Sequence, residues 1–176
     1  KDIIARYTKN NDIKRNANVS INVKDFYHVK NLKNGMDAAW LCFENFEGVE
    51  CILEGMKVRK IYLEDVNIPN FCALDLFTSN TMLKLESNLL LDFKKTTEEA
   101  VNYLDKDLDY AKYVFYKYSS EKETDLMNNI IKDTLPRFYS PFEESKRKWF
   151  SLYDYTRHNK ISKLTEEQYN SMFYVS

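Results

Sequence analysis

FSLYDYTRHNKIS, from Phe150 to Ser162, is the stretch of this sequence that says most about its fold. It begins with apolar and aromatic residues at helical spacing, continues into a polar segment, and reaches a single aliphatic residue, Ile161. A second phrase, SINVKDFYHV from Ser20 to Val29, has Ile21 near its start, followed by a segment with helical character. Both phrases predict helices joined by polar loops.

The composition of the 176 residues indicates a folded, helical protein. Hydrophobic residues make up 44%, charged residues 30% and aromatic residues 15%, which is too apolar for an intrinsically disordered chain. Because only three Gly and three Pro occur, the chain has few of the turn residues that a strand-rich fold needs. We therefore expect an all-α fold.

The charge balance argues against nucleic acid as a partner. The formal net charge is −1, from 26 basic and 27 acidic residues, and no basic block stands out. A nucleic-acid ligand is therefore not expected. No stretch approaches the ~20 apolar residues that cross a bilayer, so we also expect no membrane span.

The cysteines and the first residue bear on compartment and processing. Cys42, Cys51 and Cys72 are odd in number and lie in apolar surroundings, a pattern that favours free thiols in a reducing compartment. This predicts a cytoplasmic location. Because the chain opens at Lys1 rather than Met, we expect a processed product or a fragment of something longer.

Apolar residues three or four positions apart predict helices along much of the chain. One helix is predicted from Met36 to Met56, with an acidic face that we assign to solvent. Residues 71–93 read as two short helices, or as a helix and a linker. Val58 to Leu63 could form a brief extended stretch.

Capping signals predict where the later helices begin. Thr96 and Glu99 have the spacing of a capping box, which predicts a helix from there to about Ser119. The remaining helices are predicted from Leu126 to Leu135, ended by Pro136, then after Ser140-Pro141 with Glu143, and after the capping-box pair Thr165 and Gln168.

Together these helices and loops resemble the EF-hand family, in which a twelve-residue calcium loop joins two helices. Four loops match when an aliphatic residue is placed at position 8, and these anchors are Ile21, Ile61, Leu126 and Ile161. The resemblance implies two pairs of degenerate EF-hand-like helix-loop-helix units joined by a helical linker. The N-terminal lobe would cover 1–70, the linker 71–96 and the C-terminal lobe 97–176.

The oxygen ligands that calcium needs are mostly missing from these loops. In the last loop, the resemblance implies ligand positions occupied by Asp154, Thr156, His158, the carbonyl of Lys160, and Ser162. Asp154 is the one carboxylate among them, whereas useful calcium affinity depends on several. We therefore expect no cofactor, with calcium in this last loop as the alternative.

Other site chemistry has little support in the sequence. His28 and His158 are the two histidines, and there is no H-E-x-x-H motif or paired C-x-x-C spacing. Nothing favours a catalytic Cys–His pair over a buried thiol and a surface imidazole. We predict no catalytic residue and no enzymatic activity.

Aromatic residues are more numerous than a small core needs. The chain holds thirteen Tyr and eleven Phe, and Tyr is favoured at protein interfaces. The leading hypothesis is a non-catalytic protein-binding module, a light-chain-like, adaptor or structural subunit that holds a helix or peptide in an apolar groove. The alternatives are a regulatory helical segment of a larger enzyme, a weak calcium sensor using the last loop, and a helical interaction protein unrelated to EF-hands.

Overall fold

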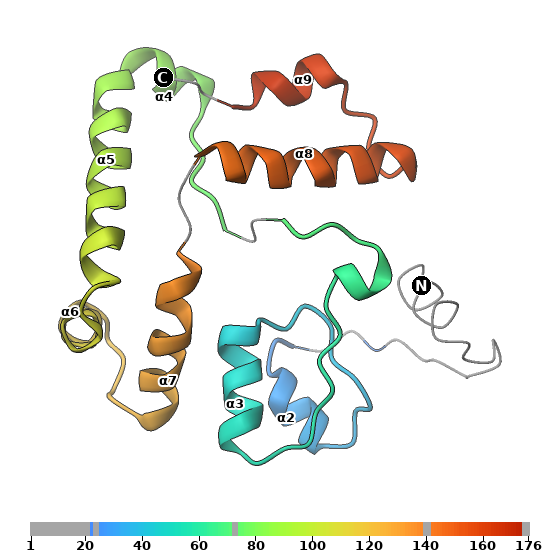
Figure 1. The fold of residues 1–176 in the computed structure, drawn as a ribbon, viewed down its shortest axis with the longest axis vertical. Helices are drawn as coiled ribbons and strands as arrows, with labels where there is room; N and C mark the ends of the chain where they lie inside the picture. The colour runs from blue at the N-terminus through green and yellow to red at the C-terminus, as the bar shows by residue number, and fades with distance from the viewer. Residues whose placement is uncertain (1–21, 23–24, 72–73, 139–141, 174–176) are drawn as a thin grey trace. The chain divides into compact units, whose positions relative to one another are not determined.

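The computed structural model describes residues 22, 25–71, 74–138 and 142–173, and all regular structure within them is helical (Figure 1). The prediction of an all-α fold is confirmed. The α-helices are α2 (His28–Lys33), α3 (Val49–Leu53), α4 (Asn80–Leu85), α5 (Ser87–Leu104), α6 (Leu108–Tyr118), α7 (Asp125–Thr134), α8 (Phe142–His158) and α9 (Glu166–Ser171). Three short elements are the π-helix η1 (Glu44–Gly48) and the 3-10 helices η2 (Glu64–Val66) and η3 (Leu135–Arg137).

The chain divides into two compact units, each built from separate segments of sequence. The described residues of unit 1 are 60–71, 74–77 and 142–173, and those of unit 2 are 22, 25–59 and 78–138. Unit 1 therefore contains η2, α8 and α9, and unit 2 contains the other helices. The division into 1–70, 71–96 and 97–176 stays a prediction.

Short polar side chains fix where four of the helices begin. The residues that cap them are Ser79 before α4, Asp107 before α6, Thr124 before α7 and Thr165 before α9. Each side chain accepts a hydrogen bond from the backbone N–H three residues further on, which satisfies a donor that the first turn leaves unpaired. At α9 the predicted capping box of Thr165 and Gln168 is confirmed.

The single helix predicted from Thr96 to Ser119 is wrong, because the structure has two helices there. Thr96 and Glu99 lie inside α5, so they form no capping box. The chain turns after Leu104, and α6 begins where the Asp107 side chain accepts from the N–H of Tyr110 at 2.9 Å. The apolar spacing runs through this break, and periodicity alone therefore could not find it.

The helix predicted from Met36 to Met56 is also shorter than expected. Leu41 has a left-handed backbone, with φ +62°, and Phe43 is extended. Both conformations interrupt a helix, so the helical segment begins at Glu44 with η1 and ends with α3 at Leu53.

Three further expectations have mixed outcomes. The helix predicted up to Pro136 is confirmed, since α7 passes into η3 at Leu135. Val58 to Leu63 forms no strand. The predicted cap at Ser140-Pro141 lies outside the described residues.

The core of unit 2 lies where α5, α6 and α7 meet. Ala111, Ile131 and Leu135 are buried together. The partly buried side chains packed around them are Leu104, Leu108, Phe115, Tyr116 and Met127. The hydroxyl of Tyr116, on α6, donates a hydrogen bond to Oδ1 of Asn128, on α7, at 3.1 Å. The helix pair is therefore joined by both apolar packing and a hydrogen bond.

Aromatic rings build the core of unit 1. Tyr153 of α8 and Tyr169 of α9 stack with ring centroids 4.6 Å apart, and the two helices lie side by side (Figure 1). The Tyr169 hydroxyl donates to the backbone carbonyl of Lys146 at 2.9 Å, and burial raises the pKa of Tyr169. Part of the aromatic excess therefore serves core packing.

The stretch FSLYDYTRHNKIS is a helix with its C-terminal cap. The helix continues to His158, and Lys160 then takes a left-handed φ of +56°. The N–H of Ile161 donates to the carbonyl of Thr156 at 2.8 Å, and that of Lys160 to Arg157 at 3.0 Å. This is the Schellman pattern that ends a helix. Asp154 to His158 are therefore helical in this structure, and the chain leaves the helix only after them.

The other anchors likewise give no support to EF-hand-like units. Leu126 lies in the first turn of α7 rather than in a loop. Ile61 is about half exposed and Ile161 is largely exposed, and the described residues contain no strand in which such anchors could pair. Ile21 lies outside the described residues.

Ile131→Ala tests the core assigned to unit 2. Ile131 is 8% exposed, so truncation should lower the free energy of unfolding by about 2–4 kcal/mol, measured by denaturant titration of helical circular dichroism. Ile52→Ala is the matched control, because Ile52 is 65% exposed and should change stability by under about 0.5 kcal/mol. Equal losses in the two variants would contradict the assigned core.

Candidate functional site

A pocket with a volume of about 160 Å³ lies within unit 2, between the start of α2, η1, α3 and α7. Aromatic, aliphatic and charged side chains share its wall. The lining residues are Phe26, Tyr27, His28, Val29, Lys30, Phe46, Glu47, Glu50 and Ile130. The pocket is partly open to solvent, and its volume is about that needed for one benzene-sized ring.

The residues before α2 form one wall of the pocket. Asp25 Oδ1 accepts from the N–H of Tyr27 and from the Asn31 side chain, each at 3.0 Å, which holds the start of α2 in place. The rings of Phe26 and His28 meet edge to face, with centroids 6.1 Å apart. This wall therefore offers aromatic faces next to an imidazole.

His28 has a buried ring nitrogen with no partner. Among the residues that the structure describes, Nε2 of His28 is the buried side-chain nitrogen or oxygen atom without a hydrogen bond. A buried polar atom left in this state costs about 1–3 kcal/mol. Because this nitrogen has almost no accessible surface, His28 lines the pocket through the rest of its side chain, and the unpaired nitrogen is a cost that the folded chain carries.

Two carboxylates form the opposite wall. Glu47 Oε2 accepts from the N–H of Phe43 at 2.7 Å, which ties the side chain to the start of η1. Neither Glu47 nor Glu50 forms an ion pair with a described residue. The two acidic side chains are therefore free of a cationic partner within the described part of the chain.

The π-helical turn of η1 positions the side chains of the acidic wall. The N–H of Gly48 donates to the carbonyl of Phe43 at 3.2 Å, a hydrogen bond that spans five residues. Single π-helical turns occur often at functional sites, because they change the direction in which side chains project. Here the turn carries Phe46 and Glu47 of the pocket wall.

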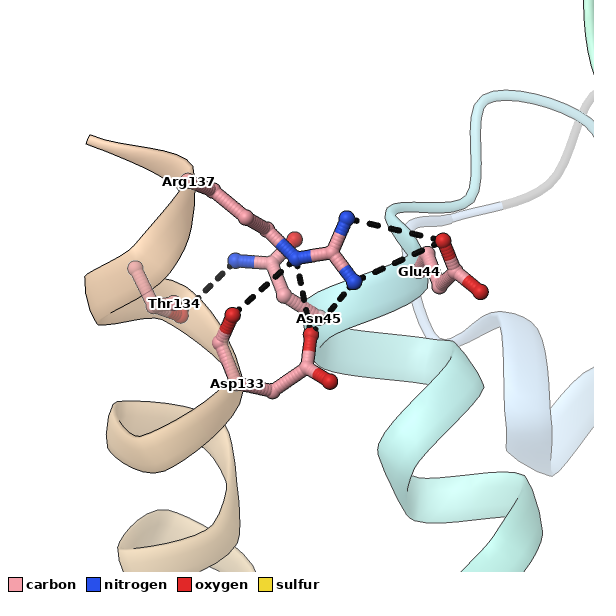
Figure 2. Close-up of polar contacts among 5 residues, drawn as sticks. All are labelled: Glu44, Asn45, Asp133, Thr134 and Arg137. Atoms are coloured by element: carbon pink, nitrogen blue, oxygen red, sulfur yellow. Dashed lines mark hydrogen bonds and ion pairs between the residues drawn. The ribbon is translucent and has the colours of Figure 1, made fainter. Parts of the chain in front are cut away.

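A polar cluster, the η1–α7 clamp, joins two of the walls (Figure 2). Its members are Glu44, Asn45, Asp133, Thr134 and Arg137. Arg137 Nη2 lies 2.6 Å from Asp133 Oδ1 and 3.4 Å from Glu44 Oε2. Asn45 Nδ2 donates to Thr134 Oγ1 at 2.8 Å. The clamp therefore holds η1, with Phe46 and Glu47, against α7, which supplies Ile130.

The charges in the clamp stabilise the guanidinium. Partial burial on its own lowers the pKa of Arg137. The hydrogen bond and charge of Asp133, followed by those of Glu44, outweigh burial and raise that pKa above its ordinary value.

The charge of Glu47, in the acidic wall of the pocket, affects the thiol of Cys42. Cys42 is an exposed residue, yet partial burial of its thiol is the main cause that raises its pKa to about 11, and the charge of Glu47 and then the neighbouring Cys51 add to it. Cys42 and Cys51 are both free thiols. Cys72 lies outside the described residues.

The site residues expected from the sequence lie elsewhere, in unit 1. Asp154, Thr156 and His158 are in the last turns of α8, where His158 Nδ1 lies 3.1 Å from Asp154 Oδ1. Lys160 and Ser162 follow the end of the helix. Their assignment as ligand positions stays a prediction. No group of three or more His, Cys, Asp or Glu that could hold a metal occurs among the described residues.

The pocket itself was missed from the sequence, although weak signals were present. His28 is one of two histidines and directly follows Phe26 and Tyr27. Glu47 and Glu50 were assigned to a solvated helix face, whereas they line the pocket. Ile130 comes from a distant segment, and nothing in the sequence pairs it with the others.

A double-mutant cycle on Asn45→Ala and Thr134→Ala tests the clamp. The two side chains are partly buried, so we expect a coupling free energy of about 0.5–1.5 kcal/mol from denaturant titrations. Lys95 and Glu99 provide the control cycle, because their exposed 4.0 Å pair should couple by under about 0.5 kcal/mol. A coupling for Asn45 and Thr134 no larger than this control would argue against the clamp.

Alkylation of Cys42 tests its environment. Because its pKa is raised to about 11 from 9.0, the unreactive protonated thiol should predominate below that pH. The rate with iodoacetamide, followed by mass spectrometry of the Cys42 peptide, should rise about tenfold per pH unit from pH 7 to 10. A rate that levels off near pH 9 would show an unshifted thiol.

Comparison with known proteins places the chain in a family. Residues 1–109 match the family described as NMT1/THI5 like, and this segment includes every pocket residue except Ile130. The searches of curated proteins and of solved structures found no match. Among the described residues, no helix is both long enough and apolar enough to cross a membrane.

The family match corrects the functional expectations drawn from the sequence. The EF-hand resemblance is wrong, and so is the degenerate calcium-binding character inferred from it. The protein-binding adaptor inferred from that resemblance is wrong for the same reason, and its alternatives are no better supported. The match spans more than half of the 176 residues, and the chain belongs to the NMT1/THI5-like family.

Proposed function

We propose that this protein binds a small-molecule substrate in the pocket between α2, η1, α3 and α7. The observation that carries the proposal is the pocket itself, whose wall comes almost entirely from the family-matched segment. A substrate-binding domain is what the family indicates. A small-molecule ligand therefore replaces the peptide partner expected from the sequence.

The make-up of the pocket suits a small organic ligand. Such sites combine apolar and aromatic walls with a few polar groups that fix orientation. Here Phe26, Tyr27 and Phe46 provide aromatic surface, and His28, Glu47 and Glu50 provide polar groups. The volume of about 160 Å³ limits the ligand to about one ring.

The proposal is for binding, and the accompanying expectation that the chain is not an enzyme stays a prediction. A binding role needs a concave surface with fixed polar groups. This pocket is partly open to solvent, and the η1–α7 clamp holds two of its walls together. The cytoplasmic location inferred from the cysteines also stays a prediction.

A fragment experiment on the complete chain tests the proposal. Single-ring compounds of up to about ten heavy atoms would be screened by ligand-observed NMR, and we expect binders that compete with one another for one site. Phe46→Ala should weaken them severalfold or more, because it removes an aromatic wall. Phe93→Ala is the matched control, since the two rings are 46% and 57% exposed and Phe93 lies on α5, outside the pocket.

The proposal fails if no fragment binds. It also fails if Phe46→Ala and Phe93→Ala weaken the binders equally. Circular dichroism of both variants would establish that each retains its helices, so that a loss of binding reports on the pocket.

His28→Phe separates ligand binding from stability. Replacing an unpartnered buried nitrogen by an apolar ring removes a desolvation cost, so the unliganded protein should gain about 1 kcal/mol of stability in denaturant titrations. Fragment affinity should stay close to that of the unchanged chain, because the Phe ring keeps the aromatic wall and Nε2 has almost no accessible surface. A loss of stability of more than about 1 kcal/mol would show that Nε2 already has a partner.

A further inference from the structure

We infer that the ligand of this pocket is an organic cation: a single-ring molecule that carries a protonated amine, preferred over neutral or anionic rings of the same size. The inference rests on the proposed function, because it names the ligand class for the same pocket. Three observations support it, namely the charges on the wall, the aromatic faces beside them, and the position of Lys30.

The first observation is that negative charge predominates on the wall. Glu47 and Glu50 contribute two negative charges and Lys30 one positive charge, so these three side chains together carry a net charge of −1. Neither carboxylate has an ion-pair partner among the described residues. One oxygen of Glu47 accepts from the N–H of Phe43, so its second oxygen and the carboxylate of Glu50 are the groups available to a ligand.

The second observation is that aromatic rings lie next to these carboxylates. Phe26, Tyr27 and Phe46 line the same pocket, and the face of an aromatic ring attracts a cation. Carboxylates and aromatic faces together favour an ammonium group, which gains a charge-assisted hydrogen bond and a ring contact at once. An anionic ligand would meet two like charges at short range.

The third observation is that a cation already occupies part of this environment. Lys30 Nζ lies 5.9 Å from the centroid of the Tyr27 ring. Lys33, one turn further along α2, instead pairs with Glu54 at 2.6 Å, outside the pocket lining. The one ammonium group of the lining thus lies within cation–π range of Tyr27, which shows that a ring of this wall accepts a cation at close range.

Three probes that share a ring and differ in charge test the inference. Benzylamine, benzyl alcohol and benzoate would be titrated at pH 7 into the complete chain, with protein chemical shifts as the readout. Benzylamine should bind about tenfold more tightly than benzyl alcohol, the effect expected of one charge-assisted hydrogen bond. Benzoate should bind most weakly, and added salt should reduce the preference for benzylamine.

Glu50→Gln identifies the group responsible. It keeps the size of the side chain and removes its charge, and it avoids Glu47, whose carboxylate also holds the start of η1. The variant should lose about tenfold in affinity for benzylamine and keep its affinity for benzyl alcohol. Glu99→Gln is the charge-matched control, because Glu99 lies on α5, outside the pocket, and it should leave all three affinities unchanged.

The outcomes separate this inference from the proposed function. If benzyl alcohol or benzoate binds as tightly as benzylamine, and Phe46→Ala weakens that binding, the pocket is a ligand site but the preference for cations is refuted. An unchanged benzylamine affinity in Glu50→Gln would refute it as well. If none of the three probes binds, the proposed function fails and the inference fails with it.

Discussion

The packing of α7 against η1 and α3 is the interaction on which unit 2 depends. The two sides are far apart in the sequence, and the hydrogen bond from Asn45 to Thr134 joins residues 89 positions apart. Two neighbouring residues of α7 connect the core of unit 2 with its pocket. Ile131 is buried in the α5–α6–α7 core, and Ile130 lines the pocket. A helix as short as α3 would not persist alone in water, so its stability must come from this packing.

Local chemistry explains which parts of the fold could be predicted. The Thr165 and Gln168 box succeeded because a cap needs nothing beyond neighbouring residues, and the scarcity of Gly and Pro correctly indicated helices. Thr96 and Glu99 had the same spacing, but they lie inside a helix that continues through them. A capping motif identifies a helix start only where the preceding chain leaves the helical conformation, and a sequence pattern does not report that.

The candidate site could not be predicted because its parts belong to separate segments. Phe26 to Lys30, Phe46 to Glu50 and Ile130 come together only in the folded chain. The sequence directed attention to Asp154 to Ser162 instead, because the polar residues that end a helix resemble those that open a calcium loop. Lys160, with its left-handed backbone, resolves that ambiguity in favour of a helix end.

The π-helical turn of η1 makes this segment sensitive to changes in chain length. Its hydrogen bond from Gly48 to Phe43 encloses one residue more than an α-helical turn would. Each residue of an α-helix advances about 100° around the axis, so a one-residue deletion here would turn the clamp residue Asn45 away from α7 or Glu50 away from the pocket. The loop at Gly35 lies outside the helices, so a change of its length would not rotate the clamp or pocket residues of η1. Relatives that keep the pocket should therefore vary in length at that loop and keep η1 at a constant length.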